Sequence, residues 1–379
     1  MATAKPNQLA NRAELWRSTM NGHNKNSVVL AHEDTPWAVL VGRPLLRVEK
    51  EENERQTLAL GASLSHGAGR RAKPEAPDGA RTCFEVDRDR ILHRSNAFKR
   101  LAGKTQVFIF PDDHMRNRLT HALEVTQIAR AIATQLRLNV PLTEAIALGH
   151  DCGHGPFGHA SEDALSYFIE EGFDHAPWGA SVVLTPLNLT QETLDGIANH
   201  SWSRPSPTTP EGEIVSWADR IAYVCHDFED AVSAGIVQPS DLPDDVVKLL
   251  GTKHSGQISG FITNIVSVVT ETGMIAMTQE YGQALASFRQ FNYDAIYNRR
   301  ASIEQAEAVQ PLIAALVEHF AKKPPAGVEH NPRSVQAYRA AVEYVAGMTD
   351  RYAVKIARGS LGWKPEQLPR GIDIPQPSN

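Results

Sequence analysis

The stretch "ALGHDCGHGPFGHASEDAL", residues 147–165, concentrates titratable side chains among glycines and a proline. These side chains are His150, Asp151, His154, His159, Glu162 and Asp163. Each imidazole or carboxylate that is removed from water must find a partner or lower the stability of the fold. The stretch is therefore either a solvated loop or a functional site.

The sequence on both sides of this stretch has the spacing of helices. Residues 117–136 carry apolar side chains at helical intervals and stop before Asn139 and Pro141. A second helix is predicted over residues 143–151, ending where glycine and proline follow, and a strongly amphipathic one over residues 213–232. His150 and Asp151 are thus expected at the end of a helix.

Further helical patterns occupy residues 261–271, 303–321 and 334–356. No run of alternating strands, no internal repeat and no βαβ rhythm is evident, so the predicted fold class is all-α, or mostly α. We predict an irregular segment and loop over residues 1–82, a core with the titratable stretch over 83–235, and a helical region over 236–379 that completes the same fold.

The bulk composition excludes some classes of protein. The chain has 379 residues and a formal net charge of −6, which argues against a surface built to coat nucleic acid. Cys83, Cys152 and Cys225 are too few and too widely spaced for a disulfide scaffold. The apolar run at residues 36–42 is too short to cross a bilayer. We expect a cytoplasmic protein with no membrane partner.

The sequence matches two known motifs only in part. His150 and His154 have the spacing of the zinc-protease motif H-E-x-x-H, but Asp151 replaces the glutamate, and the glycines and proline that follow would break the helix. Residues 103–105 read "GKT", like the end of a phosphate-binding P-loop, but Phe98 stands where that motif requires glycine. Neither motif explains the stretch.

A metal ion at a helix end fits the residues better. Neighbouring residues of a helix point about 100° apart, so His150 and Asp151 can reach one ion only near the end of their helix. His121 and Asp219, on two other predicted helices, are candidates for further ligands. Taken singly, His121 could be a buried histidine with a hydrogen-bond partner, and Asp219 a solvated aspartate. The order H…HD…D along the chain instead favours one ion bound by all of them.

Nitrogen and carboxylate ligands without thiolates suit Mn, Mg, Fe, Co or Ni with open water positions. Such an ion polarises a phosphoryl oxygen and lowers the pKa of a bound water, which is the chemistry of phosphoester and phosphoanhydride hydrolysis.

The strings "RLTH" (118–121), "HD" (150–151) and "ADRIAY" (218–223) resemble the HD-domain metal-dependent phosphohydrolases. Four longer strings are similar to the deoxyguanosine triphosphate triphosphohydrolase-like proteins within that superfamily: "RDRILHRSNAFKRLAGKTQVF" (88–108), "GHDCGHGPFGHASEDAL" (149–165), "WADRIAYVCHDFEDAV" (217–232) and "YVAGMTDRYA" (344–353). The resemblance implies an HD-domain helical fold and hydrolysis of dGTP or another deoxynucleoside triphosphate to deoxynucleoside and inorganic triphosphate.

The resemblance also assigns roles to residues. It implies that the metal ligands are His121, His150, Asp151 and Asp219, and that the catalytic group is His154, His159, Glu162 and His175. Since the 5′ oxygen leaves and needs a proton, we expect His159 to donate it, with Glu162 orienting His159 and His154 facing a phosphate oxygen. The glycines of the stretch are expected to let the backbone approach the phosphates.

Substrate binding is expected from five further residues. Arg118 and Arg220 lie within a turn of proposed ligands and are candidates for the triphosphate. The resemblance implies that Gln106 meets the deoxyribose, that Tyr223 packs where a 2′-hydroxyl would clash, and that Asp227 accepts from the 3′-hydroxyl.

Two other functions stay open from the sequence. One is another HD-domain phosphohydrolase, a 5′-nucleotidase or phosphodiesterase; the other is a regulatory protein that binds nucleotide without turnover. A homo-oligomer is expected only by family analogy. Binding of single-stranded nucleic acid is conceivable from the family but has no support in the composition. Base preference, native metal and allosteric control do not follow from the sequence.

Overall fold

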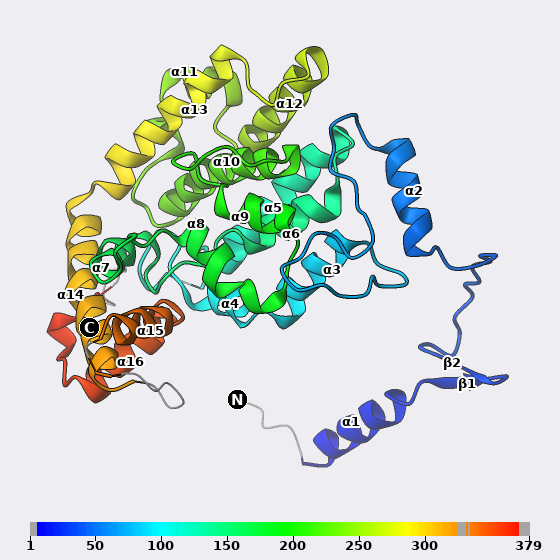
Figure 1. The fold of residues 1–379 in the computed structure, drawn as a ribbon, viewed down its shortest axis with the longest axis horizontal. Coiled ribbons are helices and arrows are strands. Elements are labelled where there is room, and N and C mark those ends of the chain that lie inside the picture. Colours follow the sequence, from blue (N-terminus) through cyan, green and yellow to red (C-terminus); the bar gives the residue numbers. More distant parts are fainter. Residues whose placement is uncertain (1–5, 112, 325–330, 333, 371–379) are drawn as a thin grey trace. The chain divides into compact units, whose positions relative to one another are not determined.

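The computed structural model describes residues 6–111, 113–324, 331, 332 and 334–370, and it divides the chain into two units, 1–45 and 46–379. The first unit contains helix α1 (Pro6–Thr19) and an antiparallel pair of short strands, β1 (His23–Lys25) and β2 (Val28–Leu30). Helices supply nearly all the regular structure of the described residues, as Figure 1 shows. The predicted mostly-α class is confirmed.

The second unit is built from helices, joined by short turns and by longer loops such as residues 58–82 and 104–117. They are α2 (Arg47–Thr57), α3 (Cys83–Asp89), α4 (Asn96–Arg100), α5 (Arg118–Gln135), α6 (Val140–Gly149), α7 (Glu162–Ser166), α8 (His175–Trp178), α9 (Gln191–Ala198), α10 (Pro210–Ser233), α11 (Asp244–Leu250), α12 (His254–Thr272), α13 (Gln279–Asn292), α14 (Arg300–Lys322), α15 (Val335–Ala346) and α16 (Asp350–Ser360). None of the helices in the described part of the chain is long and apolar enough to cross a membrane.

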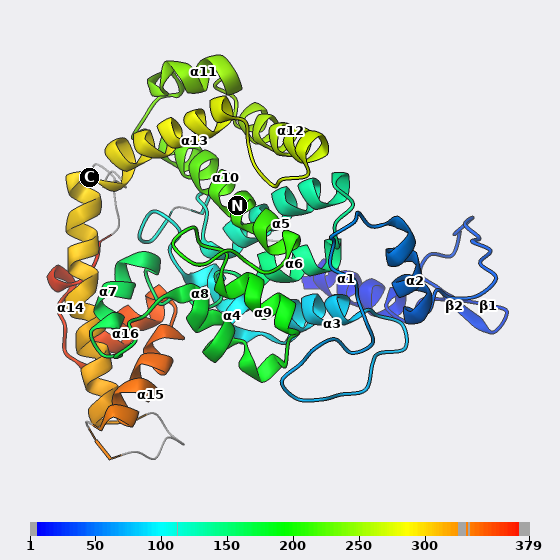
Figure 2. The ribbon, with the colours of Figure 1, turned by 45° about the horizontal axis from the view of Figure 1, so that its top comes forward.

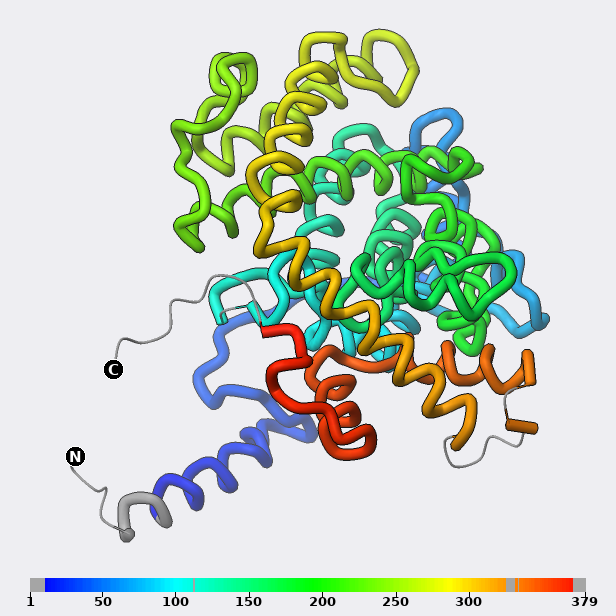
Figure 3. The backbone as a smooth tube through the Cα atoms, turned by 90° about the vertical axis from the view of Figure 1, so that its left-hand side faces the viewer, coloured from blue at the N-terminus to red at the C-terminus, as the bar shows by residue number. Residues whose placement is uncertain are grey.

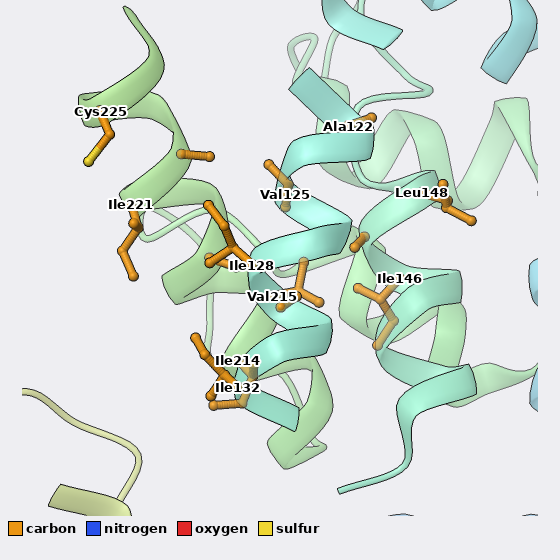
Figure 4. Close-up of a cluster of buried hydrophobic side chains, with 14 of the residues drawn as sticks. Ala122, Val125, Ile128, Ile132, Ile146, Leu148, Ile214, Val215, Ile221 and Cys225 are labelled. Carbon is orange, nitrogen blue, oxygen red and sulfur yellow. The ribbon is translucent and has the colours of Figure 1, made fainter. Parts of the chain in front are cut away.

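The main core lies between α5, α6 and α10, whose apolar faces meet in Figure 4. The labelled side chains are Ala122, Val125, Ile128, Ile132, Ile146, Leu148, Ile214, Val215, Ile221 and Cys225. The three predicted helices are present, with shifted ends. The second begins at Val140 because Asn139 accepts from the backbone N–H of Leu142 and Pro141 suits a first turn.

A second apolar cluster joins α14, α15 and α16 to the segment between α6 and α8. Figures 1 and 2 show α7 beside α14, and Figure 3 follows the chain from α13 (yellow) into α14 (orange) and on to α15 and α16. The helix predicted over residues 334–356 is wrong as one element. It divides after Ala346 because Thr349 caps a new helix by accepting from the N–H of Tyr352.

The irregular segment predicted over residues 1–82 is wrong in part, because α1 and α2 lie within it. The sequence of α2, "RVEKEENERQT", has no apolar stripe. Charged side chains hold it instead: Glu51 pairs with Arg47, and Glu54 accepts from the backbone and hydroxyl of Ser65. Residues 1–5 and 371–379 of the predicted outer segments lie outside the described residues.

The helical region predicted after residue 236 extends the main core, because its helices α12 and α13 pack on α10.

Candidate metal centre and catalytic cluster

Three helices of the main core bring three of the predicted metal ligands together. His121 lies in the first turns of α5, His150 directly follows α6, and Asp219 lies in α10. One ligand atom from each lies within 4.8 Å of the others. The Nε2 atom of His121 is 3.1 Å from Oδ1 of Asp219. The three helices therefore bring two imidazole nitrogens and one carboxylate oxygen, all from predicted ligands, close enough to bind one ion.

The donor atoms of this group suit a divalent cation. The Nδ1–H of His150 donates to the carbonyl of Ala147 (2.7 Å), so in the neutral ring Nε2 carries a lone pair. That Nε2 is buried with no hydrogen-bond partner among the described residues, and burial lowers the pKa of His150, which keeps the ring neutral. Although burial opposes it, the hydrogen bond from His121 lowers the pKa of Asp219. A neutral His150 beside a charged carboxylate fits a metal ion. Although burial opposes it, Asp219 raises the pKa of His121, so His121 would give up its Nε2 proton when it binds a metal.

Asp151 lies between this group and the neighbouring loop. Its Oδ1 is 3.5 Å from Nε2 of His150 and 3.1 Å from Nε2 of His154, and its Oδ2 accepts from Arg118 at 2.7 Å. Although burial opposes it, His150 and Arg118 hold the pKa of Asp151 well below its usual range. Asp151 is thus a charged carboxylate shared by two clusters.

Arg118, a predicted triphosphate contact, is buried and paired with a carboxylate in the structure. Its side chain is 2% exposed, paired with Asp151, and its second terminal nitrogen lies 3.4 Å from Nδ1 of His159. A Cβ on Gly158, where φ is +60°, would lie 2.5 Å from that guanidinium. At Gly158 the absence of a side chain therefore lets the backbone approach the Arg118 guanidinium closely.

Four residues of the loop and α8 form the second cluster: His154, His159, Glu162 and His175. The rings of His154 and His175 stack with centroids 3.7 Å apart. Oε1 of Glu162 lies 2.8 Å from Nδ1 of His175 and 3.2 Å from Nδ1 of His154. Glu162 therefore contacts these two imidazoles, whereas the sequence analysis expected it to orient His159.

The imidazoles of this cluster are held neutral. Burial, followed by the nearby charge of Arg118, keeps the pKa of His154 well below its usual value and lowers that of His159. Burial, followed by His200, does the same to the pKa of His175. Neutral rings can accept a proton at one nitrogen and can donate the N–H of the other to an anion.

The residues predicted to bind the sugar and triphosphate lie on α10 and before α5. Tyr223 stacks on Tyr297, and the Tyr297 hydroxyl donates to Oδ2 of Asp227 at 2.5 Å. Oδ1 of Asp227 is buried without a hydrogen-bond partner among the described residues. The guanidinium of Arg220 lies 4.6 Å from the ring centre of Trp202.

Gln106 comes directly after Thr105, which pairs with Asn117 at the start of α5. Its Oε1 is also buried without a partner among the described residues.

Comparisons with known proteins address the identity of this arrangement. Residues 118–224 match the HD domain and residues 275–358 match the phosphohydrolase-associated domain. The chain is 41% identical over 314 residues to a deoxyguanosinetriphosphate triphosphohydrolase-like protein of Caldanaerobacter subterraneus, covering 80% of this chain and 92% of that protein. The chain belongs to the HD-domain phosphohydrolases. Relatives with the same name from Clostridium perfringens and Desulfatibacillum aliphaticivorans are 39% and 37% identical, covering 81% and 82% of this chain and 95% and 96% of theirs.

Two residues of this HD-domain phosphohydrolase were missed by the sequence analysis. His200 follows α9, is grouped with His150 and Asp151, and lies 3.3 Å from His175, Nε2 to Nε2. Its Nδ1 contacts the carbonyl of Ile197, the same contact that His150 makes at the end of α6. His200 stands two residues after the end of α9, a helix that the sequence analysis did not predict. Tyr297 carried no signal in the sequence, because α13 and the turn after it bring it to Asp227 from a distant part of the chain.

Asp227 gives a pH-dependent stability that can be measured. Burial raises its pKa to about 7 from 3.8. The folded protein therefore binds a proton that the unfolded chain releases, so the carboxyl destabilises the fold progressively as pH rises from about 4 to about 7. Asp227→Asn should be more stable than the wild type by a margin that grows over this range, up to roughly 4 kcal/mol. Urea unfolding at several pH values measures it, and a margin independent of pH would contradict it.

Proposed function

We propose that this HD-domain phosphohydrolase hydrolyses deoxynucleoside triphosphates to deoxynucleoside and inorganic triphosphate. The observation that carries the proposal is the position of Asp151, which contacts His150 of the metal group and His154 of the second cluster. Metal chemistry and proton transfer would thus act on one substrate. The relatives reported above, which are named as deoxyguanosinetriphosphate triphosphohydrolase-like, support the substrate class.

The metal would be held by His121, His150, Asp151 and Asp219, as Mn, Mg, Fe, Co or Ni. When bound it supplies a polarised phosphoryl oxygen and a water of lowered pKa.

The side chains of the second cluster would handle the leaving group. A 5′ alkoxide needs a proton as it departs, and we assign this proton to His159, with His154 and His175 facing phosphate oxygens. The negative charge of a bound triphosphate raises the pKa of nearby imidazoles, which offsets the effect of Arg118 and burial. Glu162 keeps His154 and His175 in place through its Oε1.

Three further residues would recognise the substrate. Arg220, stacked on Trp202 and without a carboxylate hydrogen bond among the described contacts, would bind the triphosphate. Asp227 would accept from the 3′-hydroxyl through its unpartnered Oδ1, and Gln106 would contact the deoxyribose.

Product analysis tests the proposed reaction. Purified protein is incubated with each dNTP and Mn²⁺ or Mg²⁺, and the products are separated by ion-exchange chromatography. Deoxynucleoside and intact triphosphate in equal amounts support the proposal. A parallel incubation contains nucleoside monophosphates, and orthophosphate released there without dNTP turnover would instead identify a 5′-nucleotidase. Binding of a dNTP with no turnover in either incubation would identify a regulatory protein.

Tyr223 is expected to select the sugar. The Tyr223→Ala variant removes the ring that packs where a 2′-hydroxyl would lie, so the ratio of kcat/KM for dGTP to that for GTP should fall by about tenfold or more. The ratio is measured on the same preparation, which cancels changes in folded fraction. An unchanged ratio would end the steric explanation.

A further inference from the structure

A buried carboxylate at the start of α16, Asp350, contacts two segments that are far from it in the sequence. Its Oδ1 accepts from the backbone N–H of Phe157 at 2.6 Å. Its Oδ2 accepts from the backbone N–H of Thr105 at 2.8 Å and from the Thr105 hydroxyl at 2.6 Å. Asp350 is 3% exposed, so water does not compete for these bonds. One side chain thus holds two loops.

Lys104 makes a second connection between the same parts of the chain. Its ammonium group donates to the carbonyl oxygens of His154 and Ala346, the latter at 2.8 Å, and the residue is 4% exposed. A Cβ on Gly103 would lie 2.8 Å from a methyl carbon of Thr349. Residues 103–105 are therefore packed directly against the junction of α15 and α16.

The Phe157 end of this connection matters because the loop has an uncommon backbone conformation. Phe157 has φ of +64°, in the left-handed region that a residue with a Cβ adopts at a cost of about 1–2 kcal/mol. It lies between His154 and His159, and no α-helix covers residues 150–161. Backbone hydrogen bonds within the loop join His154 to Asp151 and Gly158 to Gly155, but none holds the N–H of Phe157, which Asp350 accepts.

The Thr105 end leads to the first helix of the metal group. Thr105 pairs with Asn117, and the N–H of Arg118 donates to the carbonyl of Lys104 at 3.1 Å. Asn117 caps α5, the helix that carries Arg118 and His121. Asp350 therefore joins the loop with His154 and His159 to the start of the helix that supplies a metal ligand.

We propose that Asp350 is a positioning residue for catalysis: it fixes the loop of His154 and His159 relative to α5, with Lys104 as its support. For its kinetic readout the inference rests on the proposed function. It gives the region matched by the phosphohydrolase-associated domain, residues 275–358, a part in shaping the site.

The alternative is that Asp350 merely stabilises the fold, and the chain offers a matched control for it. Asp87 is also fully buried and accepts from the backbone and hydroxyl of a threonine, Thr190, at 2.8 and 2.6 Å. Thr190 caps α9, outside the loop of His154 and His159. Loss of either carboxylate removes bonds to a threonine, and loss of Asp87 also breaks a buried ion pair with Arg71 and a bond from the Thr193 hydroxyl. Asp87→Asn is therefore the more severe test of the fold, but only Asp350 touches that loop.

The test compares Asp350→Asn with Asp87→Asn. An asparagine has one acceptor oxygen, so its amide N–H₂ must face either the N–H of Phe157 or that of Thr105. We expect kcat for the dNTP to fall by about tenfold or more while bound metal per chain is unchanged, since a small displacement of catalytic groups has effects of this size. Amide exchange over residues 154–159 should rise by about tenfold. Asp87→Asn should lower the unfolding midpoint without either change.

Each outcome bears on the inference. Unchanged loop exchange and kcat in Asp350→Asn, or equal losses in both variants, would overturn it. Amide exchange needs no substrate, so if the wild type turns over no dNTP, the proposed function fails and the exchange comparison still decides the inference. If Asp350→Asn does not fold, Thr105→Val, which removes only the hydroxyl donor, should show a smaller change in the same direction; no change would overturn the inference.

Discussion

Asp151→Asn is expected to lower dNTP turnover roughly a thousandfold and to deprive the protein of most of its metal, because loss of even an outer partner of a metal ligand costs about 10- to 100-fold. Asparagine preserves the shape of the side chain and one oxygen for Arg118, while it removes the charge shared by the two clusters. Turnover is measured with Mn²⁺ and each dNTP, and metal per chain by mass spectrometry.

A neighbouring carboxylate provides the control for this variant. Asp163 is exposed in the first turn of α7 and belongs to neither cluster. Asp163→Asn changes the net charge equally, so full activity and metal content are expected in it. Wild-type turnover in Asp151→Asn would show that Asp151 is no metal ligand.

Arg118→Ala is expected to lower the free energy of unfolding of the metal-free protein by about 3–5 kcal/mol, since it leaves the buried carboxylate of Asp151 without its partner. Bound metal offsets part of this loss by neutralising the same carboxylate. Urea unfolding with a chelator measures the loss of stability in the metal-free protein, and unfolding without it measures the part that bound metal offsets.

A double variant separates the ion pair from the volume of the arginine. Arg118→Ala combined with Asp151→Asn should recover about 0.5–3 kcal/mol relative to the sum of the single losses, because no unpaired charge then remains. Arg358→Ala, at an exposed position on α16, should change stability by less than about 0.5 kcal/mol. Additive losses would show that Arg118 and Asp151 are not coupled.

The parts of the fold that the sequence predicted are those in which apolar spacing and burial agree. Helices α5 and α10 carry apolar residues at helical intervals and pack with α6 in the main core. Helix α2 was missed because ion pairs and backbone contacts hold it, and two of these depend on Ser65 and Glu85, outside the helix, being near Glu54 and Lys50 in space. The division before α16 depends on a cap at Thr349, which a continuous apolar pattern conceals.

The candidate site was predictable residue by residue where a motif fixed it, and less so where the partner lies elsewhere. The sequence proposed His121, His150, Asp151 and Asp219 as one group. The structure places His121, His150 and Asp219 together, and groups Asp151 with His150 and His200. It did not show that Arg118 would pair with Asp151 or that Glu162 would contact His175. These contacts depend on the path of the loop, which residues outside it determine.

The contact between Asp350 and Phe157 has a consequence for the order in which a chain becomes active during its synthesis. All four proposed metal ligands have been translated once Asp219 is added, but Asp350 follows about 130 residues later. At roughly 5–20 residues per second, the ribosome needs between several seconds and about half a minute for this interval. A nascent chain can therefore gather its metal ligands while the His154–His159 loop still lacks its support, and hydrolysis would begin only after Asp350 has left the ribosome.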